Sequence, residues 1–194
     1  MNILTDALPY SVDVGGVEYP INTDFRAGVE FERLMLEGEK DIYKLLALFF
    51  VEQPLDVLAA FQAIQKYYAC GNESIQEDTP THNKQAYSFE IDGKIIFSDF
   101  WHFYNIDLSQ EGLHWWVFRA LLFGLPEKSE FKQRIYYRTC SLKDMSKKER
   151  QRVLKIRSQI EIKEKESNKI TLQERNDKMK AYLLKRQNET SKEV

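Results

Sequence analysis

The chain has 194 residues, enough for one domain with a hydrophobic core and an appended segment. Hydrophobic residues make up 43% and aromatic residues 13% of it, which excludes a disordered chain. No apolar run reaches the roughly 18 residues of a membrane span, and the N-terminus has no basic start followed by an apolar run, so neither a membrane protein nor a secreted one is expected.

The formal net charge is −2, but the charged residues are unevenly distributed along the chain. Residues 1–140 hold 12 Lys and Arg against 21 Asp and Glu, whereas residues 141–194 hold 16 against 9. This predicts an acidic core domain over residues 1–140 and a charged helical arm over residues 141–194. Cys70 and Cys140 lack the spacing of a metal or redox pair, so ordinary reduced thiols are expected.

A β-hairpin is predicted around Gly15-Gly16, where apolar and polar residues alternate on both sides of the turn. The expected pairs are Val14 with Val17, Val12 with Tyr19, and Tyr10 with Ile21. All six side chains share one face, which must lie on helices because a single hairpin is marginal alone.

Helical periodicity follows the hairpin. The first expected helix is capped by Asn22 or Thr23 and ends at Gly38. A short buried helix begins after Asp41 and covers the run IYKLLALFF. A third helix runs from Leu55 to Gly71. The polar segment 72–84 is expected to be an exposed loop.

The densest apolar stretch lies in the second half. Asp92 is expected to cap a helix through Tyr104, with a short strand over residues 87–91 as an alternative. Ser109 is expected to cap the next helix, which ends at Gly124 and forms the centre of the core; a further helix covers 128–138.

Two charged helices are predicted in the arm, because Ser146-x-x-Glu149 and Thr171-x-x-Glu174 have capping-box spacing. Their apolar stripe is narrow, so the arm either docks on something or lies frayed in solvent. The expected fold is mainly α, a compact helical domain with a small N-terminal β-hairpin and a protruding charged C-terminal helical arm.

No signature of a nucleotide-binding or hydrolase site occurs, and no two of the three histidines have zinc-ligand spacing on a helix. Neither a metal nor a cofactor is expected. Glu90 with Asp92, and Asp99 with Asp107, are interpreted as solvated acids and a helix cap rather than as catalytic pairs. The protein is predicted not to be an enzyme; the alternative is a site assembled from Asp92, Asp99 or His114.

The run from His114 to Arg119 contains adjacent tryptophans, which point about 100° apart on a helix. One interpretation is a protein-binding site that uses Trp115 and Arg119. The other, favoured for the run as a whole, is that both indole rings lie in the core.

The arm supplies further candidate protein-binding residues, Lys148, Arg152 and Ile156. Its basic segment 143–157 also permits contact with phosphates. Aromatic residues to stack on bases are nearly absent there and acids interrupt the basic run, so nucleic acid is a less expected partner than an acidic protein surface.

Several segments resemble the bacteriophage "gp fifteen" family: INTDFR at 21–26, YSFE at 87–90, YNIDL at 104–108 and above all LHWWVFRALLFGL at 113–125. The resemblance covers roughly residues 3–157. It implies a tail-assembly chaperone, encoded just upstream of the tape-measure gene, that coats the tape-measure protein in the host cytoplasm before the tail tube polymerises. It also implies self-association, a possible fusion or complex with a smaller tail-assembly chaperone, and no catalytic residues.

Overall fold

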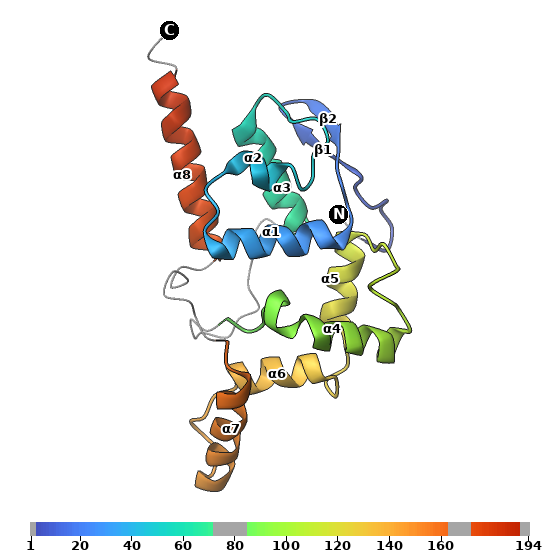
Figure 1. Cartoon of the computed structure of the whole chain (residues 1–194), viewed down its shortest axis with the longest axis vertical. Coiled ribbons are helices and arrows are strands. Elements are labelled where there is room, and N and C mark those ends of the chain that lie inside the picture. Colours follow the sequence, from blue (N-terminus) through green and yellow to red (C-terminus); the bar gives the residue numbers. More distant parts are fainter. Residues whose placement is uncertain (1–2, 72–84, 163–171, 191–194) are drawn as a thin grey trace. The chain divides into compact units, whose positions relative to one another are not determined.

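The computed structural model describes residues 3–71, 85–162 and 172–190. In these residues the chain forms eight helices and one two-stranded antiparallel sheet (Figure 1), which confirms the predicted mainly α fold with an N-terminal hairpin. The chain divides into a first unit, Met1–Ile75 with Leu113–Val117 and Glu164–Val194, and a second unit, Gln76–Gly112 with Phe118–Lys163.

The first unit contains the hairpin and four complete helices among its described residues. These elements are β1 (Ser11–Val14), β2 (Val17–Pro20), α1 (Phe25–Glu37), α2 (Ile42–Leu46), α3 (Val57–Tyr68) and α8 (Leu172–Thr190), together with the first turn of α5 (Trp115–Gly124). Within this unit β1 packs on α3, α2 packs on α3, and α8 packs on α1 and α3.

The hairpin has the predicted register. Val14 pairs with Val17, Val12 pairs with Tyr19, and the N–H of Ile21 donates to the carbonyl of Tyr10 at 3.0 Å. Gly15 and Gly16 form the turn at φ values of 65° and 87°, which glycine adopts without strain. Val14 is buried, but Tyr10 and Val17 remain exposed, so the predicted apolar face is covered only in part.

Aromatic rings form the core of the first unit. Phe31 of α1 is fully buried, and its ring lies 5.6 Å from that of Phe49, 6.4 Å from Phe61 and 5.2 Å from Tyr68, measured between centroids. These separations fall in the range that aromatic pairs prefer. The chain thereby joins α1, α3 and the segment after α2 around one side chain.

The second unit contains α4 (Phe89–Tyr104), the rest of α5, α6 (Glu130–Thr139) and α7 (Lys147–Ile160). Its core is centred on Phe100 of α4, which stacks on Phe118 of α5 with ring centroids 5.3 Å apart. Leu122 and Phe131 are also fully buried. Residues 89–91 belong to α4, so the alternative strand over 87–91 is wrong.

The basic helix α7 packs on α6. Arg157 donates from Nε to the carbonyl of Tyr137 at 2.8 Å and from Nη2 to the carbonyl of Cys140 at 2.9 Å. Val153 is buried on the same helix. Ser146 caps α7 as predicted, because its hydroxyl accepts from the N–H of Glu149.

Three predicted helix starts are wrong by a few residues. Asp24, rather than Asn22 or Thr23, caps α1, because its carboxylate accepts from the N–H of Arg26. Ser88, rather than Asp92, caps α4. Ser109 does not cap α5, which begins at Trp115. It lies in a turn where its N–H and hydroxyl both donate to the carboxylate of Asp107.

The short buried helix is also smaller than predicted, since α2 covers only Ile42–Leu46 of the run 42–50. The predicted loop over 72–84, the cap at Thr171 and the joint near Ser167-Asn168 lie outside the described residues. The division at residue 140 stays a prediction; among the described residues, α7 belongs to the second unit and α8 to the first.

Candidate functional site

The two adjacent tryptophans close the end of α3. Trp115 donates from Nε1 to the carbonyl of Tyr68 at 2.9 Å, and Trp116 donates from Nε1 to the carbonyl of Tyr67 at 2.8 Å. Carbonyl groups in the last turn of a helix lack the N–H donors of a following turn, so these indoles supply donors there, and the N–H of Cys70 also donates to the carbonyl of Tyr67. Both rings also stack on the tyrosine whose carbonyl they bind. The core interpretation of this run is therefore confirmed.

His114 anchors the start of α5 to the N-terminal segment. Its Nδ1 accepts from the N–H of Trp116 at 3.1 Å, and its Nε2 lies 2.9 Å from the carbonyl of Pro9. The network assigns the proton to Nε2, since Nδ1 acts as an acceptor. Both ring nitrogens are thus engaged in holding the chain.

Of the two protein-binding candidates in this run, one is internal and one lies at the boundary. Trp115 is 0% exposed, so its ring cannot touch a partner while the first unit is folded. Arg119 is half-buried in the second unit, with Nη1 3.4 Å from the hydroxyl of Tyr87 and its guanidinium 4.8 Å from the ring centre of Phe123. The hypothesis of a site built from Trp115 is corrected: that ring serves packing and the capping of α3.

A buried ion pair holds the second unit together. Arg138 of α6 binds Asp92 of α4 through two contacts, 2.6 Å from Nη1 to Oδ2 and 2.9 Å from Nη2 to Oδ1. Asp92 is 0% exposed and also accepts from the N–H of Ser88 at 3.1 Å. Arg138 donates from Nε to the carbonyl of Ile160, the last residue of α7, at 2.8 Å. Three helices therefore meet at one carboxylate and one guanidinium.

Asp92 and Asp99 are neither solvated nor a helix cap, so their interpretation was wrong. Asp99, like Asp92, is buried, and its carboxylate accepts from the backbone N–H of Phe131 at 2.8 Å near the start of α6. Both carboxylates are satisfied by structural donors, as buried charges must be. Glu90 is exposed, as expected.

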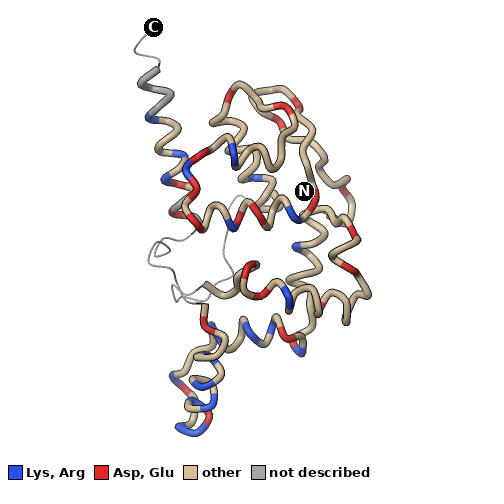
Figure 2. The backbone as a smooth tube through the Cα atoms, in the orientation of Figure 1, with Lys and Arg blue, Asp and Glu red and all other residues tan. Residues whose placement is uncertain are grey.

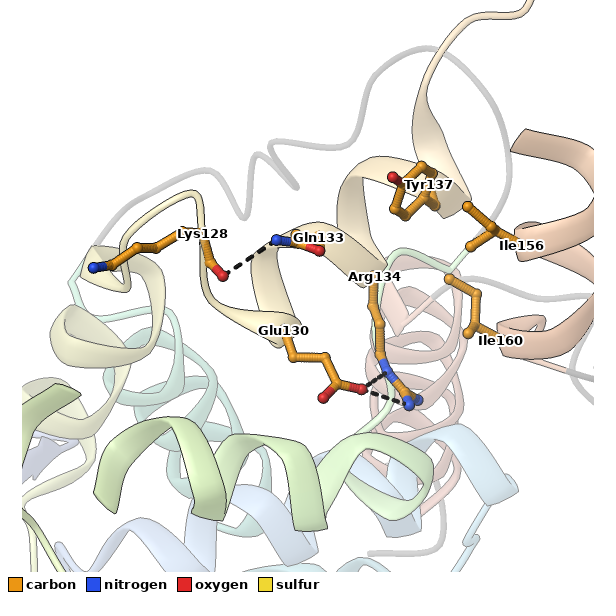
Figure 3. A pocket seen from close by; sticks show the side chains of 7 residues that line it. All are labelled: Lys128, Glu130, Gln133, Arg134, Tyr137, Ile156 and Ile160. Carbon is orange, nitrogen blue, oxygen red and sulfur yellow. Dashed lines mark hydrogen bonds and ion pairs between the residues drawn. The ribbon is translucent and has the colours of Figure 1, made fainter. Parts of the chain in front are cut away.

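An open hollow lies between α6 and α7, with a cavity volume of about 390 Å³ (Figure 3). Its lining residues are Lys128, Glu130, Gln133, Arg134, Tyr137, Ile156 and Ile160. Arg134 is paired there with Glu130 at 3.0 Å, and Gln133 donates to the backbone carbonyl of Lys128. Within the described ranges, no group of three or more His, Cys, Asp and Glu side chains could hold a metal ion.

The arm candidates Lys148, Arg152 and Ile156 all lie on α7 but on two of its faces. Ile156 points toward the hollow beside Tyr137 (Figure 3), whereas Lys148 and Arg152 are exposed. Lys155 continues their face at helical spacing, and these three cations are called the α7 ridge below. Figure 2 shows how Lys and Arg gather along α7.

A second exposed surface was missed by the sequence interpretation. Phe97 and Trp101 stand one helical turn apart on α4 and are 39% and 53% exposed. We call this pair the α4 face. The available signal was their spacing: the buried stripe of α4 contains Ile96 and Phe100, which leaves residues 97 and 101 on another side.

Fold and surfaces together define a mainly helical protein that exposes an aromatic helix face and a basic helix ridge. The chain belongs to a bacteriophage family, since the family model described as "Bacteriophage Gp15 protein" matches residues 4–162. That range runs from the segment before the hairpin to the end of α7. No match was found among curated proteins or solved structures. No helix in the described ranges combines the length and apolar character needed to cross a membrane.

Proposed function

We propose that the chain is a tail-assembly chaperone that binds the tape-measure protein in the host cytoplasm and catalyses no reaction. Membership of the Gp15 family supports a role in a phage. The observation that carries the binding role is the α4 face, where Phe97 and Trp101 expose apolar rings on a well-formed helix. Two neighbouring exposed rings on one helix face support a site of protein contact.

The physical need for such a chaperone lies in its partner. A long helical tape-measure chain exposes an apolar stripe until tube subunits cover it, and exposed stripes aggregate. Two rings one turn apart on α4 suit a stripe in which apolar residues recur every three or four positions. Many copies with modest individual affinity would hold the chain by multivalency and still yield to tube subunits.

Contacts between copies form a further part of the proposal. The α7 ridge places Lys148 and Arg152 on an exposed face, and the residues up to 140 carry the excess of acids. Such charges fit an acidic surface of a second copy or of a smaller tail-assembly chaperone. Exposed pairs are individually weak, so this contact should dissolve at high salt.

Co-expression with the tape-measure protein of the same phage tests the main proposal. The wild-type chain should retain the tape-measure protein on an affinity column, and Trp101→Glu should reduce the retained amount at least about tenfold, as loss of an aromatic hot spot does. Leu154→Glu makes the same change at an exposed apolar residue of α7 and should leave retention unchanged.

Two results would contradict the chaperone role. One is a wild-type chain that fails to retain the tape-measure protein although both are expressed and folded. The other is equal retention by Trp101→Glu and the wild type, which would remove the α4 face from the interface.

A nucleic-acid-binding regulator is the second candidate, and the α7 ridge is the observation that favours it. Three phosphate contacts by Lys148, Arg152 and Lys155 predict that the logarithm of the affinity for duplex DNA falls with the logarithm of salt with a slope of roughly −3. Arg152→Glu should flatten this slope. No measurable binding at low salt would dismiss this candidate.

A further inference from the structure

We propose that α8 occupies a docking surface meant for a helix of a partner chain. The surface, called the α8 seat, consists of the sides of α1 (Phe25–Glu37) and α3 (Val57–Tyr68) against which α8 packs. The proposed occupant is an amphipathic helix with a narrow apolar stripe, and α8 competes with it. The inference rests on the proposed chaperone role, to which it adds a second contact surface and its regulation.

The way α8 lies on the seat defines the chemistry of the occupant. Among the α8 residues whose side chains are described, the buried ones are Asn176, Met179 and Leu183, which follow one another at spacings of three and four. The neighbouring Tyr182 and Leu184 are 49% and 47% exposed. The seat therefore contacts one apolar stripe of a helix. Residues at such spacings are how protein surfaces recognise amphipathic helices.

One polar atom that α8 buries lacks a hydrogen-bond partner within the described part of the chain, which is unfavourable for a permanent part of a core. Oδ1 of Asn176 is buried and has no hydrogen-bond partner among the described residues. An unpaired buried polar group opposes docking, because it has lost its water and gained nothing. A partner helix with an apolar residue in place of Asn176 would avoid that loss and displace α8.

The family match separates the seat from its present occupant. The matched range 4–162 contains α1 and α3 completely and ends before α8, which begins at Leu172. The seat thus belongs to the part of the chain that the family model matches, and α8 lies outside the matched range. A surface inside the matched range that is covered by a helix from outside it fits a binding site with an intramolecular competitor.

Opening the seat in the full-length chain tests the proposal. The probe is a fluorescein-labelled synthetic peptide of residues 171–190, which has the stripe described above, and the readout is fluorescence anisotropy. Leu183→Asp should expel α8 and raise the affinity for the peptide at least about tenfold over the wild type, a difference of about 1.4 kcal/mol. Leu184→Asp, the same change on the exposed side, should bind the peptide as weakly as the wild type.

A variant expected to lower the peptide affinity distinguishes the proposal from a simple loss of folding. Asn176→Leu should hold α8 more firmly and bind the peptide more weakly than the wild type. Equal peptide affinity in Leu183→Asp, Leu184→Asp and the wild type would overturn the proposal. So would a wild-type chain that elutes as a dimer that Leu183→Asp converts to a monomer, because the occupant would then be α8 of a second copy.

The peptide assay contains no tape-measure protein, so the two proposals fail separately. If Leu183→Asp binds the peptide but the protein retains no tape-measure protein, the proposal for the α8 seat is supported and the chaperone role is contradicted. Retention of the tape-measure protein without peptide binding does the reverse. When both hold, Leu183→Asp should also retain more tape-measure protein than the wild type.

Discussion

Replacing Gly28 of α1 by alanine should destabilise the protein although alanine is the better helix former. A Cβ at this position would lie 2.5 Å from Cδ2 and 2.7 Å from Cζ3 of the Trp115 indole. Such separations are far inside van der Waals contact, which for carbon atoms begins near 3.5 Å. The absence of a side chain at residue 28 is what lets the indole lie against α1.

The indole cannot retreat from the added methyl group. It is 0% exposed, it stacks on the Tyr68 ring at 5.1 Å between centroids, and its Nε1 is bound to the carbonyl of Tyr68. Overpacking of this kind costs about 3 kcal/mol at the upper end of the usual range. The gain in helix propensity returns about 1 kcal/mol, so Gly28→Ala should lower the free energy of unfolding by about 2 kcal/mol.

Differential scanning calorimetry measures the outcome. For a chain of this length the expected loss corresponds to a Tm lower by roughly 4–8 °C. Gly93→Ala is the matched control, because Gly93 lies inside α4 with no atom within 4 Å of an added Cβ. That change should raise the free energy of unfolding by about 0.5–1 kcal/mol. A Gly28→Ala protein that melts at or above the wild-type temperature would refute the reasoning.

Three further changes test other contacts. Arg138→Met leaves the buried carboxylate of Asp92 without its main partner and should lower the free energy of unfolding by about 3–5 kcal/mol in urea titrations. Adding Asp92→Leu to that variant should recover most of the loss. A loss below about 1 kcal/mol in Arg138→Met alone would contradict a structural ion pair. The hydrogen bond from Lys44, together with the backbone N–H groups of Asp41 and Lys40, lowers the pKa of Glu39 from 4.5 to about 2, so the stabilising contribution of Glu39 is complete above pH 4.5 and is lost as the pH falls toward 2. In an NMR titration Lys44→Met should move the midpoint part of the way back toward 4.5, and an unmoved midpoint would exclude Lys44 as the main cause. Gly16→Val should cost about 1–2 kcal/mol because Gly16 has a φ of 87°, and Gly16→Asn should cost less; equal thermal melting of both variants would argue against strain in the turn.

Local chemistry explains which parts of the fold could be predicted from the sequence. The hairpin register follows from a two-glycine turn and alternating residues, all within a dozen positions. The end of α1 at Gly38 follows from a left-handed residue that closes a helix. Helix starts were harder, because several nearby residues are able to cap and only the folded chain selects one. At α4 the hydroxyl of Ser88 takes the cap, and Asp92 is turned inward.

The candidate site depended on contacts that local patterns do not contain. Asp92 and Arg138 lie 46 positions apart, and no spacing rule links an acid in one helix to an arginine two helices later. Trp115 and Trp116 carried a visible signal, since adjacent tryptophans are unusual, but their partners are backbone carbonyls at the end of α3. The α4 face was accessible to sequence reasoning, because Phe97 and Trp101 fall outside the buried stripe of their own helix.

The link from Arg138 to the carbonyl of Ile160 has a dynamic consequence. The guanidinium that binds this carbonyl also binds Asp92, which accepts the amide of Ser88 at the cap of α4. Release of the end of α7 and fraying of the first turn of α4 should therefore occur as one cooperative opening event. In native-state hydrogen exchange, the amide of Ser88 should exchange at the rate set by detachment of α7.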